Sequence, residues 1–269
     1  MKVRFMSLAS GSSGNCYYVG VDNYGILIDA GIAMRTITKR LKEAGIGMDS
    51  IRAVLITHDH SDHIKGVGGL GEKLHIPVYA TDRTHAAINH SYCVGERLTT
   101  CVRHIEKETP FRIADIGIEA FDVPHDSNDS VGYCLTIGAV TFVFATDLGE
   151  VSPTVDAYIR RADYLVMEAN YDEEMLRRGR YPWVLQQRIV SATGHLSNRA
   201  TATWLADNYA PHLRSIWLCH LSRDNNTPQL AYDAVAEGLR QRGIEPGRDV
   251  ELCALGRNIA SPMYEIVAE

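Results

Sequence analysis

Short apolar runs separated by turn residues mark the first part of the chain. Runs of this length, bounded by serine, glycine and asparagine, are typical of β-strands. They predict strands at residues 3–8, 16–20 and 25–30. Residues 34–44 instead repeat apolar side chains with a helical period, because Ile37 and Leu41 fall on one face and Gly45 closes the segment. This second pattern predicts a helix.

The middle of the chain combines both kinds of element. Residues 53–56 form an apolar run that is too short for a helix and therefore predict a buried strand. A helix over about 64–75, a strand at 77–80 and a helix that begins at Thr84 are expected next. Beyond residue 110 the chain alternates apolar runs with turns, which predicts strands at residues 111–113, 116–123, 131–137 and 140–145.

The second half alternates strand and helix patterns. Strands are expected at residues 163–168 and 215–219, and helices at about 172–178, 182–192, 198–208 and 228–241. The last helix has Thr227 at its N-cap and Pro228 at its first helical position, which is a strong start signal. A short strand pair near 249–254 and 262–267 is expected to close the chain.

The composition is that of a globular protein. Of the 269 residues, 45% are hydrophobic and 22% are charged, and no segment is composed like a flexible linker. The chain contains neither an apolar run of about 18 residues nor a secretory signal, so we expect a cytoplasmic protein without a membrane partner. The six cysteines lack metal-binding spacing and are expected to be buried thiols in a reducing compartment.

The net charge narrows the class of partner only slightly. A formal charge of −6 argues against a non-specific nucleic-acid coat protein, which would be basic. It does not exclude a nuclease, because acidic metal ligands lower the net charge and bound cations restore positive charge where a phosphate would bind.

The densest group of ionisable side chains follows a predicted strand in the middle of the chain. Residues 58–63 contain three histidines and two aspartates. His58 and His60 alternate, so on an extended backbone they point to one side and can bind one cation. Asp62 and His63 lie at the turn into the next helix, where they can bind a second cation. Such density is typical of a metal site rather than of a polar loop.

The sequence of residues 57–63, THDHSDH, resembles the HxHxDH motif of the metallo-β-lactamase fold, a large set of mostly two-metal hydrolases. At a finer level the chain resembles the YycJ (WalJ) branch of that fold, which is similar to nucleases. The resemblance implies an α+β architecture, an αββα sandwich in which two mixed sheets face each other with helices outside. It also implies a single domain over residues 1–269.

Further positions match the later motifs of this fold. Each follows a predicted strand, and they come in the family's order: His125, Asp147 and His220. The resemblance implies two cations that share Asp147 and are otherwise bound by His58, His60 and His125 and by Asp62, His63 and His220. Asp29, at the end of the third strand, would orient ligands without binding metal itself.

This ligand set indicates hydrolytic chemistry. Imidazole and carboxylate ligands without thiolate suit Zn²⁺, and also Mn²⁺ or Fe, so the sequence leaves the identity of the two metals open. Two cations about 3.5–4 Å apart generate a bridging hydroxide near neutral pH and stabilise the charge of the transition state. No cysteine stands at a motif position, which argues against antibiotic hydrolysis.

Residues outside the metal set point to phosphodiesters. Glu168 and His195 resemble the Glu and His that the transfer-RNA-processing enzymes of this fold carry in comparable loops. Glu168, His195 and Asp62 are expected to be catalytic. A Glu–His pair such as Glu168 and His195 can protonate the departing oxygen. Ser222 resembles the serine in the last motif of the nuclease members and is expected to contact phosphate. Tyr171 departs from the branch's pattern, which has a histidine there, so a proton-relay role is in doubt.

Two other stretches leave alternatives open. Arg177, Arg178, Arg180 and Arg188 surround residues 181–183 and are candidates to bind a phosphate backbone. Trp183 lies among them as a base-stacking residue or, equally, as the buried anchor of a solvated helix end. Residues 10–15, rich in serine and glycine, favour a plain turn over a phosphate cradle, although they resemble the family's loop near the metal rim.

The resemblance therefore implies a dinuclear-metal phosphodiesterase that hydrolyses nucleic acid, in particular a 5′–3′ DNA exonuclease that prefers DNA to RNA. A glyoxalase II-like thioester hydrolase or a small-molecule phosphodiesterase would use the same metal core. The thioester hypothesis predicts a helical domain after His220, which the sequence does not show. A binding module that has lost catalysis would have lost ligands, whereas every metal motif is filled here.

Overall fold

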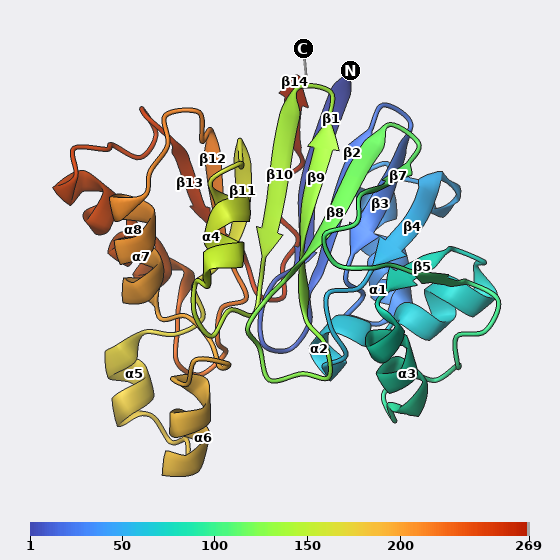
Figure 1. The fold of residues 1–269 in the computed structure, drawn as a ribbon, viewed down its shortest axis with the longest axis horizontal. Helices are drawn as coiled ribbons and strands as arrows, with labels where there is room; N and C mark the ends of the chain where they lie inside the picture. The colour runs from blue at the N-terminus through green and yellow to red at the C-terminus, as the bar shows by residue number, and fades with distance from the viewer. Residues whose placement is uncertain (268–269) are drawn as a thin grey trace.

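Two seven-stranded sheets pack face to face, with helices on the outer face of each (Figure 1). The computed structural model describes residues 1–267. The expected αββα sandwich is confirmed. Within residues 1–267, none of the helices is long and apolar enough to cross a membrane.

The first sheet collects strands from both ends of the chain. In spatial order it contains β14 (Tyr264–Val267), β1 (Lys2–Ala9), β2 (Cys16–Val21), β3 (Tyr24–Ile28), β4 (Ile51–Leu55), β5 (Val78–Ala80) and β6 (Val102–His104). Strands β14 to β3 pair antiparallel, and β3 to β6 pair parallel. The carboxyl ends of β3 and β4 therefore lie at the same edge of the sheet.

The second sheet repeats this arrangement. In spatial order it contains β13 (Glu251–Ala254), β12 (Ser215–Cys219), β11 (Tyr164–Glu168), β10 (Val140–Ala145), β9 (Val131–Ile137), β8 (Ile116–Asp122) and β7 (Phe111–Ile113). Strands β7 to β10 pair antiparallel, and β10 to β13 pair parallel. As a result β10, β11 and β12 also end at one edge.

Aromatic side chains fill much of the space between the sheets. Phe5 and Tyr17 of the first sheet meet Phe142, Phe144 and Trp217 of the second. The ring centroids of Phe5 and Trp217 are 4.3 Å apart, and all five side chains are essentially buried. Large rings at facing positions remove much apolar surface from water, which makes this layer the main source of cohesion between the sheets.

Helices cover the outer face of each sheet. Two lie on the first sheet: α1 (Met34–Glu43) and α3 (Asp82–His90). Three lie on the second: α4 (Pro153–Ile159), α7 (Asn198–Asp207) and α8 (Pro228–Gln241). Two more, α5 (Glu173–Arg178) and α6 (Trp183–Ile189), project below the second sheet in the view of Figure 1.

The structure differs from the expected elements in several places, among them β6, which was not predicted. The helix expected over 64–75 is broken into α2 (Ser61–Ile64) and a π-helical segment, Gly69–Lys73. The glycines there permit close contacts that a regular helix with larger side chains would not, since a Cβ on Gly66 would lie 2.4 Å from the Ile32 carbonyl oxygen. Helix α4 was not predicted, although Ser152 caps it and Pro153 starts it.

The last two strands were predicted to pair with each other, and this is wrong. Strand β13 pairs with β12 in the second sheet, whereas β14 pairs with β1 in the first. The connection between them crosses from one sheet to the other, held by backbone hydrogen bonds from Leu255 to Leu218 and from Ser261 to Ser7. It thereby closes one side of the sandwich.

Candidate metal centre and active site

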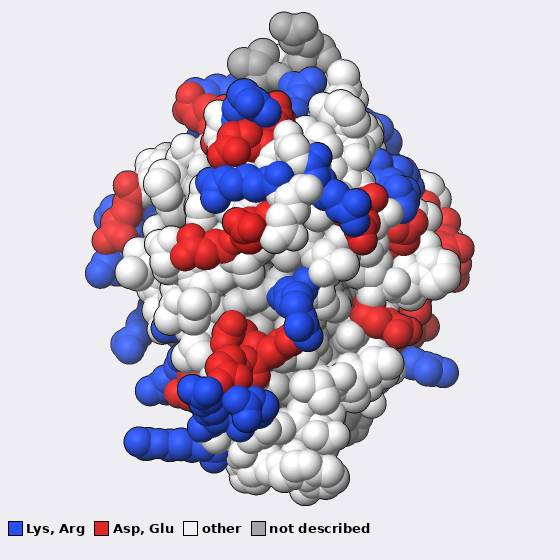
Figure 2. Space-filling model, turned by 90° about the vertical axis from the view of Figure 1, so that its left-hand side faces the viewer, with Lys and Arg blue, Asp and Glu red and all other residues white. Residues whose placement is uncertain are grey.

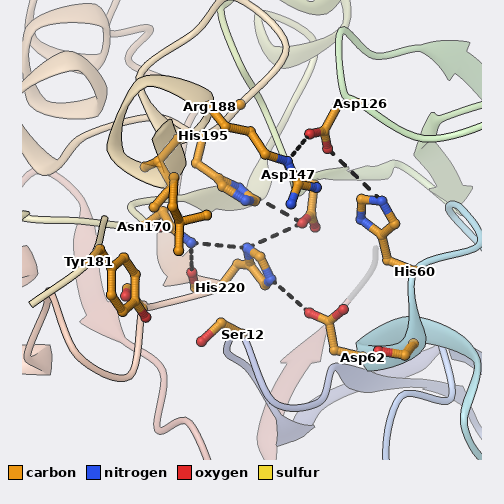
Figure 3. Close-up of a pocket in the computed structure, with 15 residues that line it drawn as sticks. Ser12, His60, Asp62, Asp126, Asp147, Asn170, Tyr181, Arg188, His195 and His220 are labelled. Carbon is orange, nitrogen blue, oxygen red and sulfur yellow. Dashed lines mark hydrogen bonds and ion pairs between the residues drawn. The ribbon is translucent and has the colours of Figure 1, made fainter. Parts of the chain in front are cut away.

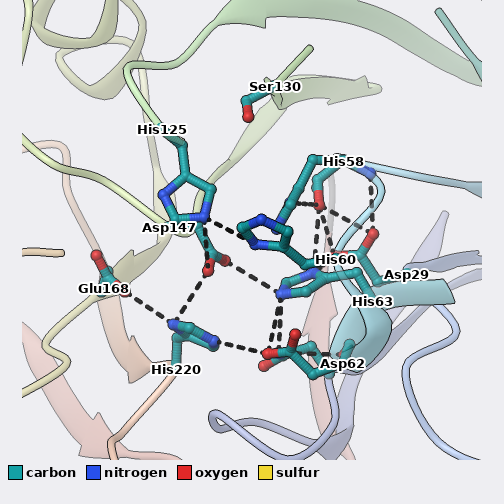
Figure 4. Close-up of polar contacts among 12 residues, drawn as sticks. Asp29, His58, His60, Asp62, His63, His125, Ser130, Asp147, Glu168 and His220 are labelled. Carbon is teal, nitrogen blue, oxygen red and sulfur yellow. Dashed lines mark hydrogen bonds and ion pairs between the residues drawn. The ribbon is translucent and has the colours of Figure 1, made fainter. Parts of the chain in front are cut away.

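Strand ends deliver the polar side chains of the site to one edge of the sandwich. Asp29 follows β3, His58 lies beyond β4, and Asp147 and His220 lie beyond β10 and β12 (Figure 4). Because these strands are parallel within each sheet, their carboxyl ends meet at this edge. Asp29, Asp147 and His220 have φ angles of 60°, 55° and 52°, a left-handed conformation that residues other than glycine rarely adopt. Such backbone strain is typical of functional sites.

His58, His60 and His125 form the first group of candidate ligands. Their donor atoms lie within 4.8 Å of one another, and His60 Nδ1 is 3.2 Å from His125 Nε2. His58 Nδ1 lies 3.0 Å from Thr57 Oγ1, and His125 Nδ1 lies 3.1 Å from the carbonyl oxygen of Gly194. These contacts hold the two rings from behind and leave their Nε2 atoms facing the centre of the group.

Asp62, His63 and His220 form the second group, with donor atoms again within 4.8 Å of one another. His220 Nε2 is 3.2 Å and His63 Nε2 is 3.6 Å from Asp62 Oδ2. Asp147 lies between the groups, with its Oδ2 3.3 Å from His63 Nε2 and its Oδ1 3.8 Å from His125 Nε2. This is the position expected of a carboxylate shared between two cations.

The donor atoms of this cluster fit a metal ion. His58 Nε2 and Asp147 Oδ2 are buried and have no hydrogen-bond partner among the described residues. Burial of polar atoms without a partner is costly, and a bound cation would remove that cost. The donors are imidazole nitrogens and carboxylate oxygens, which suit several divalent metals. The fold thus carries His and Asp clusters that are capable of binding metal ions.

Burial and neighbouring charges shift the pKa values of the cluster in opposite directions. Burial lowers the pKa of His58 well below its usual value, and the nearby imidazoles lower it further. Burial also lowers the pKa of His63, but the carboxylates of Asp147, Asp29 and Asp62 outweigh it and raise that pKa to about 9. A cation at the site would therefore have to displace a proton from His63 at neutral pH.

Asp29 lies behind the cluster, where its carboxylate contacts Thr57 and His63. Its carboxylate accepts hydrogen bonds from the backbone N–H of Thr57 at 2.9 Å and from the Thr57 hydroxyl at 3.0 Å. Its Oδ2 also lies 2.8 Å from His63 Nδ1. Asp29 faces away from the centre of the cluster, so it can orient His63 but contributes no ligand atom.

Glu168 joins the cluster to His195. Its Oε1 lies 2.8 Å from both His195 Nδ1 and His220 Nδ1, and its Oε2 accepts hydrogen bonds from the backbone N–H groups of Leu148 and Leu196. Burial raises the pKa of Glu168, but the two imidazoles lower it well below the usual range. Both oxygens are thus engaged in a fully buried carboxylate, which leaves Glu168 to hold the histidines rather than a metal.

His195 reaches the open side of the site. Its side chain is 21% exposed and lines the central cavity, whereas Glu168 behind it is inaccessible. Burial lowers the pKa of His195, but the Glu168 carboxylate outweighs it and raises the pKa above the usual value. His195 therefore faces the cavity while Glu168 holds its Nδ1.

A cavity of about 380 Å³ opens over the cluster (Figure 3). His60, Asp62 and His220 lie on its floor side together with Asp147, and Ser12 and Ser222 contribute hydroxyl groups to its lining. The predicted Ser222 therefore faces the cavity. This size suits one or two nucleotide units or another small ligand.

Of the four arginines in the candidate basic stretch, Arg188 alone lines the cavity. Arg177 and Arg178 pair with Glu174 on the outer surface of α5, and neither they nor Arg180 line the cavity. Arg188 of α6 lines it instead and pairs with Asp126. The helical register of α6 decides this difference, and the composition of the stretch contains no signal of it.

Sequence reasoning also missed Asn15 and Asn170. Asn15 Nδ2 lies 3.0 Å from His63 Nε2, and Asn170 Nδ2 donates to the His220 carbonyl oxygen at 2.8 Å. The likeness of residues 10–15 to a loop at the family's metal rim was the available signal for Asn15. Asn170 follows β11 directly after the Glu168 strand end, but asparagine at a strand end usually indicates a turn.

Comparisons with known proteins find similarity over nearly the whole chain. A family model described as "Beta-lactamase superfamily domain" matches residues 24–221. The chain is 37% identical over 252 residues to Exodeoxyribonuclease YycJ of Bacillus anthracis, covering 94% of this chain and 95% of that relative. It is 37% identical over 264 residues to Exodeoxyribonuclease WalJ of Streptococcus pneumoniae, covering 98% of each.

A solved structure shares the architecture at much lower identity. The metallo-β-lactamase fold protein YhfI of Bacillus subtilis superposes with a TM-score of 0.70 at 16% identity, covering 98% of this chain and 100% of that one. At such identity the likeness establishes the fold alone.

Proposed function

The chain belongs to the metallo-β-lactamase superfamily, and from this premise we propose that it is a metal-dependent nuclease, an exonuclease that hydrolyses DNA. Two observations together carry the proposal. The identity to two exodeoxyribonucleases extends over nearly the whole chain, and the cavity that would take the substrate opens directly over the His and Asp clusters. The 5′–3′ polarity and the preference for DNA over RNA belong to the same proposal.

Two divalent cations, Zn²⁺ or Mn²⁺ with Fe as a further candidate, would be held by the two ligand groups. His58, His60 and His125 would hold one, Asp62, His63 and His220 the other, and Asp147 would contact both. When bound, such cations supply Lewis acidity that activates water and stabilises negative charge in the transition state. The unpartnered His58 Nε2 and Asp147 Oδ2 support this assignment.

Within this proposal the protein's own residues protonate the leaving group, orient the attacking water and contact the phosphate. His195, held at Nδ1 by Glu168, presents its ring to the cavity and would donate a proton to the departing oxygen. Glu168 orients that ring and favours its protonated form. Asp62 would orient the attacking water, and Ser222 would contact a phosphate oxygen from the cavity wall.

We further propose that residues 1–269 act as one domain in the cytoplasm. The six cysteines are free thiols, four of them buried, which is the state expected in a reducing compartment. The sandwich has strands from both ends of the chain side by side in one sheet, which supports a single cooperative unit.

Digestion of end-labelled nucleic acid tests the proposed activity. Metal-reconstituted protein should shorten end-labelled DNA from one end, faster than it shortens RNA, and the label position gives the polarity. The Asp62→Ala variant should lose this activity. If elemental analysis shows bound metal but DNA and RNA remain intact after incubation, the nuclease proposal is contradicted. Such a result would favour a thioester or small phosphodiester substrate.

A further inference from the structure

Residues 172–190, which contain α5 and α6, form an arm that walls one side of the cavity. The arm has a small core of its own, in which Leu176 and Ile189 pack with Tyr171 and the partly buried Leu185. It is attached to the loop after β12, where the Tyr181 hydroxyl donates to Asp224 at 2.9 Å. The arm is therefore positioned beside the His220 loop and faces the cavity.

Arg188 of this arm is the sole lysine or arginine among the described residues that line the cavity. Its guanidinium pairs with Asp126, which in turn lies 3.6 Å from His125 Nε2 and 3.9 Å from His60 Nε2 (Figure 3). The Arg188 side chain is 57% exposed and Asp126 is 25% exposed, so an incoming anion can reach the guanidinium and would compete with Asp126 for it.

The outer surface of α6 is unusually apolar for a solvated helix. Trp183 and Val184 are 72% and 73% exposed, and Val190 just beyond the helix is 49% exposed. Trp183 is therefore not a buried anchor, which removes one of the two alternatives left open by the sequence. Val184 and Arg188 are four residues apart and share one face of the helix, whereas Trp183, five residues before Arg188, lies about 140° around the helix axis from it.

This surface lies at the end of the molecule where α5 and α6 project. In Figure 2 the lower end of the molecule is largely white, and basic and acidic side chains gather above it. Arg177, Arg178 and Arg180 belong to this arm and are exposed. Arg177 and Arg178 are paired with Glu174, whereas Arg180 has no ion pair among the described residues. The arm thus combines an exposed aromatic ring with exposed guanidinium groups, the residue types that bind single-stranded nucleic acid.

We propose that α6 guides a single-stranded segment of the substrate: Arg188 binds a backbone phosphate beside the cavity, and Trp183 stacks on a base farther along the strand. Arg188 lines the cavity and Trp183 stands in the first turn of the same helix, so a strand that leaves the cavity along α6 passes both. The guanidinium of Arg188 complements the charge of a phosphate. The base must come from a single strand, because in a duplex both of its faces are already stacked on neighbours. This inference rests on the proposed nuclease function and adds how the substrate is held.

Tryptophan fluorescence tests the stacking directly. The chain has three tryptophans, of which Trp217 is 2% exposed and Trp204 is partly buried, so an added ligand reaches mainly Trp183. Metal-loaded protein mixed with a cleavage-resistant phosphorothioate oligonucleotide should lose fluorescence, and the loss should disappear in Trp183→Phe excited at the tryptophan wavelength. Quenching of equal size in Trp183→Phe would overturn the stacking.

Kinetics on DNA tests the contribution to binding. Trp183→Ala should raise KM for a single-stranded 12-mer about tenfold, the size of one lost base stack, and raise it less for a dinucleotide. Tyr92→Ala, which removes another exposed aromatic ring outside the arm, should leave both KM values unchanged. An unaltered 12-mer KM in Trp183→Ala, with DNA still cleaved, would overturn this inference and leave the proposed function intact.

The salt dependence of binding tests Arg188. Arg188→Gln should lower the slope of log Kd against log salt by about one, and Arg188→Lys should restore it. An unchanged slope in Arg188→Gln would overturn the phosphate contact. A concentration-dependent dimer that Trp183→Ala abolishes would show that the apolar surface joins two copies of the chain, which also contradicts the inference. Failure of the wild type to cleave any nucleic acid would instead overturn the proposed function.

Discussion

His63 Nδ1 lies 2.8 Å from Asp29 Oδ2, and both side chains are fully buried. The contact joins the end of β3 to the first turn of α2. The Asp29 carboxylate accepts a hydrogen bond from the Nδ1–H of His63. This contact leaves the Nε2 atom of His63 facing the ligand cluster. Asp29 also accepts from Thr57, whose own hydroxyl lies 3.0 Å from His58 Nδ1. One carboxylate thereby contacts, directly or through Thr57, a candidate ligand from each of the two groups.

Asp29→Asn should weaken metal binding about 10–100-fold, the usual effect of losing an orienting carboxylate. The amide keeps the shape of the side chain but removes the negative charge that favours the required tautomer of His63. Competition with a chromophoric chelator measures the affinity, and circular dichroism verifies the fold. Asp49→Asn, on the exposed surface, serves as the matched control. Equal affinity in Asp29→Asn and wild type would contradict the orienting role.

Gly31→Ala should destabilise the protein by at least about 2 kcal/mol and lower its metal content. A Cβ on Gly31 would lie 1.6 Å from the Asp62 carbonyl oxygen and 2.7 Å from the Asn15 backbone nitrogen. The ligand loop must therefore move to admit one methyl group. Urea denaturation measures the loss. Gly95→Ala, where a Cβ would meet no atom within 4 Å, should change stability little, and a similar loss in both variants would refute this account.

His195→Asn should lower kcat on DNA by about 10²–10⁴ and have a smaller effect on bis(p-nitrophenyl) phosphate. The reason is that a nitrophenolate leaves without needing a proton, whereas a nucleoside oxygen needs one. The variant should keep its metal, because Glu168 rather than a cation holds His195 at Nδ1. Steady-state kinetics on the two substrates gives the ratio. An equal loss on both would exclude a general-acid role, and loss of metal would place His195 among the ligands.

Metal-free protein should lose stability as the pH rises from about 6.5 through 9. The carboxylates around His63 raise its folded pKa to about 9, above the value near 6.5 of an unfolded histidine. The stabilisation is therefore complete below pH 6.5 and lost as His63 gives up its proton, a change on the order of 1–3 kcal/mol. The pKa values of His220 and His195 are also raised, which acts in the same direction.

Metal-loaded protein provides the comparison for this pH dependence. Ligands must be deprotonated to bind a cation, so the metal's contribution grows over the same pH range in which the proton's contribution vanishes. Thermal denaturation with and without chelator should give Tm curves that diverge from pH 6.5 to 9. Other buried groups, such as the cysteines, titrate alike in both forms. Parallel curves would contradict the assigned shift of His63.

The local sequence was sufficient for most elements and for the centre of the site. Strands and helices appear as short periodic patterns, so β8 to β12 and α5 to α8 lie close to their predicted positions. The cluster at residues 58–63 was recognisable because its ligands are adjacent along the chain. Helix 64–75 was less predictable, since glycines there allow close contacts that break a regular helix.

The metal-type side chains and the strand ends that carry them could be identified from local sequence, because spacing and residue type are local properties. Three features required the folded chain: β13 and β14 join different sheets, Glu168 contacts both His195 and His220, and Arg188 rather than Arg177 faces the cavity. These relationships depend on which distant segments pack together and on the register of each helix. The packing of distant segments and the register of each helix are set by how the whole chain buries its apolar surface. A local sequence pattern carries no information about that burial.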